Sequence, residues 1–137
     1  VGCIRSDGAQ PVLMTQPTLL RPGLKEEERD VLDFGRVFCS RQISAWNIEM
    51  PSPESLARAM AAYNEVTRKV AREEAVPLVD LSAVVPRTLD YFVDDVHHTP
   101  LATALISNQV ANVLLPLFAS RDSPLPVRDA SSPKPGS

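Results

Sequence analysis

The residue types best suited to chemistry lie together at residues 94–100, which read Asp-Asp-Val-His-His-Thr-Pro. Asp94 precedes His97 by three positions, so on a loop its carboxylate can fold back beneath the imidazole ring. A carboxylate placed there accepts a hydrogen bond from one ring nitrogen, fixes the tautomer and stabilises the imidazolium. The other ring nitrogen can then take a proton from an alcohol and return it to a leaving group. We therefore regard Asp94 and His97 as candidate catalytic residues.

The same run allows two other interpretations. His97 can be an incidental histidine on an exposed acidic loop. Alternatively, Asp94, Asp95, His97 and His98 can ligate a metal ion. Four neighbouring residues rarely wrap one ion, and the chain has only two histidines. We expect neither a metal site nor a cofactor, and we expect His98 to lie at the surface or beside the substrate.

The composition is typical of a soluble globular domain, with 137 residues, 44% hydrophobic and 23% charged. The formal net charge of -3 gives no reason to expect a nucleic acid or an anionic membrane as a partner. We find no apolar run near the roughly 20 residues of a membrane span, so we expect none. Cys3 and Cys39 are too few for a disulfide framework or a cysteine zinc site. We expect free, half-buried thiols, although a single bridge between them stays open.

Two buried strands and two long helices alternate along the chain. Residues 11–16 (PVLMTQ) and 76–81 (VPLVDL) are short, mostly apolar runs that favour strands buried on both faces of a parallel sheet. Residues 52–74 and 99–117 each begin with Ser or Thr before proline and continue with apolar residues at helical spacing. This alternation predicts an α/β fold with a parallel sheet covered by helices on both faces. Because two strands are too few for such a core, we expect the missing strands to precede Val1.

The remaining segments are expected to flank this core. Residues 1–5 are typical of the end of a helix, which Gly8 would stop. Residues 21–30 are polar and have room for one short helix. Residues 31–50 show no clean period and are expected to form a long loop, on which Trp46 packs against the core or lines a pocket.

Three pieces of the chain resemble successive parts of one known family. Tyr63-Asn64-Glu65, followed by Arg68 and Val70-Ala71, is similar to the last long helix of the SGNH (GDSL-type) hydrolases. Residues 76–81 are similar to the final strand of that family, and residues 94–99 to its last block, whose pattern is Asp-x-x-His. The resemblance is good over residues 63–117 and looser over the preceding part, where residues 11–17 are similar to the family's preceding strand.

The resemblance implies a flavodoxin-like three-layer α/β/α fold and hydrolysis of esters by a serine nucleophile, without metal. It implies that His97 is the general base, that Asp94 orients it, and that the substrate is a small-molecule, carbohydrate or lipid ester. The family's Gly-Asp-Ser block, and the glycine and asparagine blocks of its oxyanion hole, do not occur in the 137 residues. Ser6 is followed by Asp-Gly rather than preceded by Gly-Asp, and Ala102 stands where the family commonly has glycine.

We therefore predict that residues 1–118 form a partial SGNH-hydrolase domain and that residues 119–137 are a disordered Pro/Ser-rich tail. Such a fragment carries the base and its acid without the nucleophile, so we expect it to be inactive by itself. A non-enzymatic alternative is a partial α/β module that associates with another chain through the open edge of strand 11–16. A weaker alternative is a metal-dependent hydrolase that uses the Asp/His cluster.

Overall fold

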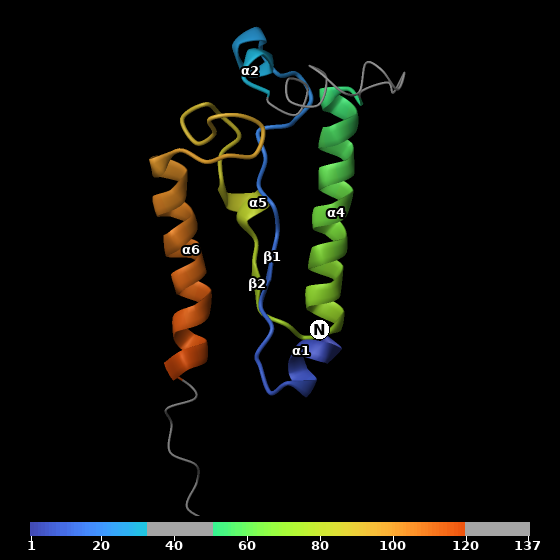
Figure 1. The fold of residues 1–137 in the computed structure, drawn as a ribbon, viewed down its shortest axis with the longest axis vertical. Coiled ribbons are helices and arrows are strands. Elements are labelled where there is room, and N and C mark those ends of the chain that lie inside the picture. The colour runs from blue at the N-terminus through green and yellow to red at the C-terminus, as the bar shows by residue number, and fades with distance from the viewer. Residues whose placement is uncertain (33–50, 120–137) are drawn as a thin grey trace, which may run out of the picture.

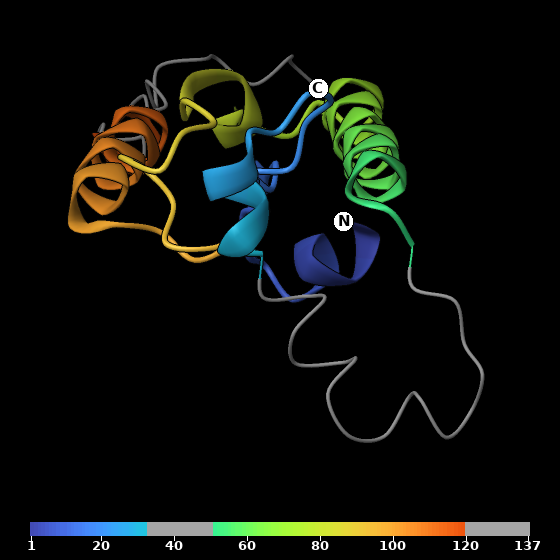
Figure 2. The same ribbon diagram turned by 90° about the horizontal axis from the view of Figure 1, so that it is seen from above.

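The computed structural model describes residues 1–32 and 51–119 (Figure 1). Within these ranges, strands β1 (Leu13–Met14) and β2 (Leu78–Val79) form a two-stranded parallel sheet. Helix α4 (Pro53–Glu73) lies on one side of the strands and helix α6 (Pro100–Ala119) on the other, as Figures 1 and 2 both show. This is the general α/β architecture, with helices on both faces, that the alternation of elements predicts.

Three shorter helices complete the elements of the described ranges: α1 (Gly2–Ser6), α2 (Glu26–Asp30) and α5 (Leu81–Val84). Helices α1 and α2 confirm the predicted helix end at residues 1–5 and the predicted short helix within residues 21–30. Gly8 follows α1 with a φ of 73°, a left-handed conformation that glycine adopts without steric cost. The chain turns there before it enters β1.

Helix α4 begins as the sequence predicts. The Ser52 hydroxyl accepts a 3.2 Å hydrogen bond from the backbone N–H of Ser55, and Pro53 is the first helical residue. The buried side chain of Asn64 accepts a 2.8 Å hydrogen bond from the backbone N–H of Gln16 and donates one of 2.8 Å to the Gln16 carbonyl. This amide therefore fixes the position of α4 relative to the residues that follow β1.

The hydrophobic core lies between the strands, the two long helices and the loops that follow the strands. Its buried members are Leu19, Leu20, Leu24, Ala57, Val79, Leu81, Val85 and Phe92. Helix α6 adds one partly buried stripe, formed by Leu105, Ile106, Val110 and Val113. This stripe is the apolar helix face that the sequence predicts. Ala102 is fully buried in the first turn of the same helix, so alanine is accommodated where the resembling family has glycine.

Both strands are shorter than predicted. The paired residues are 13–14 and 78–79 rather than 11–16 and 76–81, and Leu81 begins α5 instead of ending a strand. The side chain of Met14 is 47% exposed, so β1 is not buried on both of its faces. The prediction of a doubly buried strand is wrong at this residue, because the described part of the sheet ends at β1.

The open side of β1 follows from its hydrogen bonds. The backbone N–H groups of Leu13 and Thr15 donate to the carbonyls of Pro77 and Val79 in the neighbouring strand segment, over 2.9 and 3.1 Å. Because successive residues of a strand direct their backbone groups to opposite edges, Met14 directs its N–H and carbonyl away from β2. This edge of β1 has no paired strand within the described residues.

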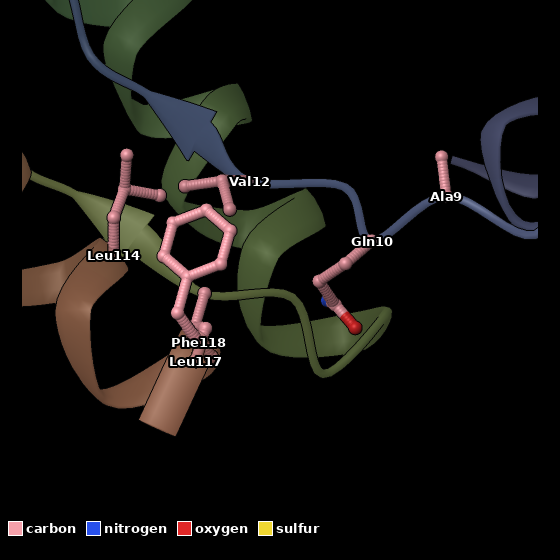
Figure 3. Close-up of a pocket in the computed structure, with 6 residues that line it drawn as sticks. All are labelled: Ala9, Gln10, Val12, Leu114, Leu117 and Phe118. Atoms are coloured by element: carbon pink, nitrogen blue, oxygen red, sulfur yellow. The ribbon is translucent and has the colours of Figure 1, made fainter. Parts of the chain in front are cut away.

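Helix α6 continues through Pro116 and ends at Ala119, two residues beyond the predicted end at residue 117. A proline inside a helix removes one intrahelical donor, and contacts beyond the helix can offset that loss. Figure 3 shows Leu114, Leu117 and Phe118 around Val12, on the approach to β1, where they line a pocket of about 190 Å³. The α6 residues of this pocket belong to the last turns of the helix, next to its end at Ala119.

Helix α6 is also long and apolar enough to cross a membrane, by length and composition alone. It has 20 residues with a mean hydropathy of 1.5, and its sequence contains no Asp, Glu, Lys or Arg. The prediction that no apolar run has this length is therefore wrong. One face of α6 packs on the core. Only 6% of its apolar 18-residue stretch is buried, however, and Leu101 and Leu115 are largely exposed.

Some predictions fall on residues outside the described ranges. These are Trp46, Cys39, the loop from residue 33 to residue 50, and residues 120–137 of the tail. Cys3 is free and exposed, because α1 buries none of its residues. This corrects the expectation of a half-buried thiol at Cys3.

Candidate functional site

The candidate residues lie on the loop of residues 85–99, which joins α5 to α6 beyond the carboxyl ends of both strands (Figure 1). Within this loop the chain folds back on itself. Phe92 pairs with His98 in an isolated antiparallel bridge, and the backbone N–H of Val93 donates a 2.9 Å hydrogen bond to the His97 carbonyl. Phe92 is 1% exposed. The tight loop that carries the candidate residues is therefore anchored in the core.

The carboxylate of Asp94 holds this loop together from inside. Its Oδ1 accepts hydrogen bonds from the backbone N–H groups of Val96, over 2.9 Å, and of His97, over 2.7 Å. Its Oδ2 lies 2.6 Å from Nδ1 of the His97 ring. The backbone bonds form the turn in which an aspartate accepts from residues two and three positions ahead. They leave the second oxygen to orient the imidazole, so the structure brings the two predicted residues together.

The environment of Asp94 favours its charged form. Burial by itself raises the pKa of this carboxyl, but the backbone N–H groups of His97 and Val96, and the imidazole of His97, outweigh burial and lower the pKa below its usual value. A carboxylate that stays ionised at neutral pH only accepts hydrogen bonds, so the proton between the two side chains resides on Nδ1. The tautomer of neutral His97 is thereby fixed, with Nε2 as the basic nitrogen.

The two side chains differ sharply in exposure. The side chain of Asp94 is 14% exposed and that of His97 is 73% exposed. An oriented base must reach a proton on another group, whereas the acid behind it acts only through the ring. This distribution, with the acid sheltered and the base accessible, is the arrangement that proton transfer requires.

His98 does not lie where the sequence predicts. Its ring packs on Phe92 with a centroid separation of 5.1 Å, and its Nε2 is buried without a hydrogen-bond partner among the described residues. Burial lowers the pKa of His98, the neighbouring His97 lowers it further, and Asp94 opposes both. His98 is therefore a half-buried, neutral packing residue. The correction arises because successive residues of the bridge point to opposite sides, so exposing His97 turns His98 inward.

The backbone of Asp95 ties the loop to the rest of the fold. It is 4% exposed, and its backbone carbonyl accepts hydrogen bonds from Thr18 Oγ1, over 2.7 Å, and from the Leu19 N–H, over 3.1 Å. These bonds tie the loop to the segment after β1. Over residues 1–32 and 51–119, no group of three or more His, Cys, Asp or Glu residues is arranged to hold a metal ion.

A groove of about 440 Å³ opens beside this loop. One wall is formed by helix α4, through Leu56, Ala59, Met60 and Tyr63. The remaining lining residues are Leu20, Asp95 and Val96. Among the residues that the structure describes, six of the seven lining side chains are apolar or aromatic, so the groove is suited to a hydrocarbon group rather than to a charged one.

The sequence predicts only that the α4 residues of this groove share one apolar face of the helix. Leu56, Met60 and Tyr63 share a helical stripe with Val66, but Tyr63 and Val66 are 63% and 59% exposed. A helical stripe reports which residues share a face and does not report what covers that face. The signal in the sequence that could have shown which face of α4 is covered is Asn64, a polar residue beside the stripe. Its side chain makes the contact with Gln16, just after β1.

A second carboxylate at the carboxyl end of the sheet is structural. Asp80 follows β2 and receives hydrogen bonds from Arg68, over 2.8 and 2.9 Å, and from Thr15 Oγ1, over 2.8 Å. Arg68 is the main cause that lowers the pKa of Asp80 to about 2, and burial opposes it. Ser82 of α5 also donates to this carboxyl, over 3.2 Å, so Asp80 joins α4, α5 and the residue that follows β1.

Ser6 is remote from the candidate pair. It lies in α1, at the end of the molecule opposite the loop of residues 85–99 (Figure 1), and its hydroxyl donates a 2.7 Å hydrogen bond to the Cys3 carbonyl. Ser6 therefore does not serve His97 as a nucleophile in this arrangement, in agreement with the sequence context around it.

The described fold defines the chain as an α/β protein with a parallel pair of strands between helices. Comparison of the chain with protein-family models, with curated proteins and with solved structures gives no match. Its function is therefore argued from the site alone.

Proposed function

We propose that this chain is the C-terminal part of a serine ester hydrolase of the SGNH type, with a flavodoxin-like three-layer fold. In this proposal His97 is the general base and Asp94 orients it. The observation that supports it most strongly is the 2.6 Å contact between Asp94 Oδ2 and His97 Nδ1, on a carboxylate already held by two backbone N–H groups. Its position beyond the carboxyl ends of parallel strands is the usual place for a site in an open α/β sheet.

The reaction uses the exposed face of the imidazole. Nε2 of His97 takes the proton of a serine hydroxyl as the serine oxygen attacks the ester carbonyl carbon. The imidazolium, stabilised by Asp94, then returns this proton to the departing alcohol, which leaves an acyl-enzyme for water to hydrolyse by the same proton transfers. The serine and the oxyanion donors are supplied from outside these 137 residues, by residues joined to them in a longer chain or by another chain.

The open edge of β1 supports the proposal that the serine and the oxyanion donors come from further strands. Met14 is half exposed, and its backbone groups face away from β2. A parallel sheet buried between helix layers normally has more strands than two. Further strands on this edge would extend the sheet and bring their own carboxyl ends toward His97. The small-molecule, carbohydrate or lipid ester proposed as substrate would bind at that shared edge.

Hydrolysis of a chromogenic acyl ester tests the proposal. The 137 residues alone are expected to show no turnover above buffer, and a polypeptide that also carries the serine-bearing strands is expected to be active. In the active protein, His97→Ala is expected to lower kcat/KM by at least about 10³-fold and Asp94→Asn by a comparable factor. Ester turnover by the 137 residues that disappears in His97→Ala, or turnover by the longer protein that survives this substitution, contradicts the proposal.

A second candidate function has its own supporting observation. The exposed edge of β1 can template pairing with another chain, so the chain can act as a non-enzymatic α/β module that associates through Met14 and its neighbours. Light scattering separates the two cases. A concentration-dependent oligomer that becomes monomeric in Met14→Lys favours association, whereas a well-folded monomer at all concentrations argues against it.

A further inference from the structure

We propose that the groove between α4 and the loop of residues 85–99 binds the hydrocarbon chain of an ester substrate. This inference rests on the esterase function proposed above and adds the class of acyl or alkyl group that the site accepts. It is carried by three observations: the position of the groove, the chemistry of its walls and its size.

The groove and the base are positioned by the same carboxylate. Val96 lines the groove, and its backbone N–H donates to Asp94 Oδ1 over 2.9 Å. The other oxygen of Asp94 holds the ring of His97, which is the next residue in the chain. A group seated against Val96 is therefore held in a fixed relation to the imidazole, as an ester whose carbonyl lies beside His97 must be.

The walls suit a neutral chain. The α4 side offers Leu56, Met60 and the ring of Tyr63, and the opposite side offers Leu20 and Val96. The acidic side chain of Asp95 also belongs to the lining. Apolar side chains nevertheless make up most of the described lining, which suits a neutral hydrocarbon chain rather than a charged group.

The size of the groove sets the length of the chain that it takes. A volume of about 440 Å³ falls within the range of sites for small organic ligands, roughly 300–1,000 Å³. Each methylene group that leaves water on binding strengthens affinity by about fourfold at room temperature. A medium-length chain is therefore expected to bind about two orders of magnitude more tightly than one that is four methylene groups shorter.

The test is a titration of the 137-residue protein with methyl esters from methyl acetate to methyl octanoate, followed by backbone amide resonances in NMR spectra. We expect the affinity to rise with chain length, and we expect methyl octanoate to shift the resonances of Ala59, Tyr63 and Val96. Methyl octanoate that binds no more tightly than methyl acetate, or that shifts only distant resonances, overturns the assignment.

A matched pair of variants separates this groove from unspecific binding. Ala59 and Ala61 are both exposed residues of α4, but only Ala59 lines the groove. Ala59→Trp is expected to fill the groove and weaken methyl octanoate binding at least tenfold, whereas Ala61→Trp is expected to leave it unchanged. Equal effects of the two substitutions overturn the proposal, as does a groove covered by a second copy, which light scattering detects as a dimer that binds no ester.

The binding test of the groove and the hydrolysis test of the esterase function can fail separately. His97→Ala is expected to leave methyl octanoate binding unchanged, because the imidazole does not line the groove. Failure of binding with intact hydrolysis in the longer protein removes the groove and keeps the esterase. Hydrolysis that does not need His97 removes the esterase mechanism proposed here, whatever the chain binds.

Discussion

At the scale of single residues, two aspartates near the carboxyl end of the sheet have opposite uses. The Asp80 carboxylate accepts hydrogen bonds from Arg68 of α4 and from Thr15, which follows β1. In Asp94, one carboxylate oxygen accepts hydrogen bonds from the backbone of its own loop, and the other contacts the ring of His97. Both carboxyl groups have a lowered pKa, so the pKa shift alone does not separate structure from chemistry. The exposed imidazole that Asp94 holds is the feature that supports the chemical role proposed for Asp94.

The orienting role of Asp94 is open to a direct measurement on the 137-residue chain. In the neutral form of His97 we expect the proton on Nδ1, because the Asp94 carboxylate accepts from that nitrogen. In Asp94→Asn, the amide can donate to Nδ1, and we expect the proton to move largely to Nε2. The ring ¹⁵N chemical shifts at high pH report the tautomer. The same tautomer in both proteins contradicts the role that we give to Asp94.

Asp80 is expected to make stability depend on acid. Its pKa of about 2 in the folded protein lies below the ordinary 3.8, so its stabilisation is complete above about pH 4 and is lost as the pH falls toward 2. The contribution is at most about 2 kcal/mol, because the side chain is partly solvated. We expect Asp80→Asn to lower the stability at pH 7 and to flatten its decline between pH 4 and pH 2.

Urea unfolding at a series of pH values provides the measurement, and Asp30→Asn, a change at an exposed aspartate at the end of α2, is the control. An Asp80→Asn protein whose stability declines with acid as steeply as that of the unchanged protein contradicts the expected linkage. The expected linkage is also contradicted if Asp30→Asn flattens the loss of stability with acid as much as Asp80→Asn does.

At the scale of elements, the sequence predicts what is decided locally. The Ser52-Pro53 start of α4 and the Thr99-Pro100 start of α6 follow from caps and from proline geometry, and both are present. The fold-back at Asp94 and His97 also depends on near neighbours, so their contact is readable from a three-residue spacing. The inward turn of His98 depends on the bridge to Phe92, which no spacing within the run encodes.

Other elements depend on distant partners, and there the sequence predicts less. The lengths of the two strands are set by how far β1 and β2 run side by side, so the apolar runs overestimate them. The stripe on α4 predicts a shared face, but Tyr63 shows that the face is only partly covered. The groove is formed by α4, Leu20 and the loop of residues 85–99 together, so no single segment of the sequence predicts it.

The anchoring of α4 gives an element-scale test. Asn64→Ala leaves both the N–H and the carbonyl of Gln16 without the partners that Asn64 supplies. Loss of these partly buried bonds is expected to cost about 1–2 kcal/mol of unfolding free energy. Asn112→Ala, an exposed change on α6, is the matched control and is expected to cost less than about 0.5 kcal/mol. Urea unfolding of the two variants gives the comparison, and equal costs contradict the anchoring role.

At the scale of the whole molecule, the described part is a sheet with helices on both sides and apolar surfaces that remain open. Met14 on β1, Tyr63 and Val66 on α4, and Leu115 on α6 are all substantially exposed. Exposed apolar residues on three elements together indicate surfaces that meet other structure or ligands. In the proposals made above, the edge at Met14 would meet further strands or another chain.

The packing of α6 decides how its apolar length is to be understood. As a helix that covers the sheet, α6 has one face on the core at Val110 and another in solvent at Leu115. We expect Val110→Asp to lower the unfolding free energy by about 2–4 kcal/mol, because it places a charge against the core. Leu115→Asp is expected to change it by less than about 0.5 kcal/mol. Thermal and urea unfolding of the purified variants in aqueous buffer provides the measurement.

A helix that crosses a bilayer responds in another way. Both substitutions would then place a charge in hydrocarbon, where either one is costly. Flotation of the protein with lipid vesicles distinguishes the two arrangements. A chain that stays in the aqueous fraction and is damaged by Val110→Asp alone has α6 on its sheet. Flotation with vesicles that both substitutions reduce equally contradicts that packing and would detach α6 from the layer that covers β2.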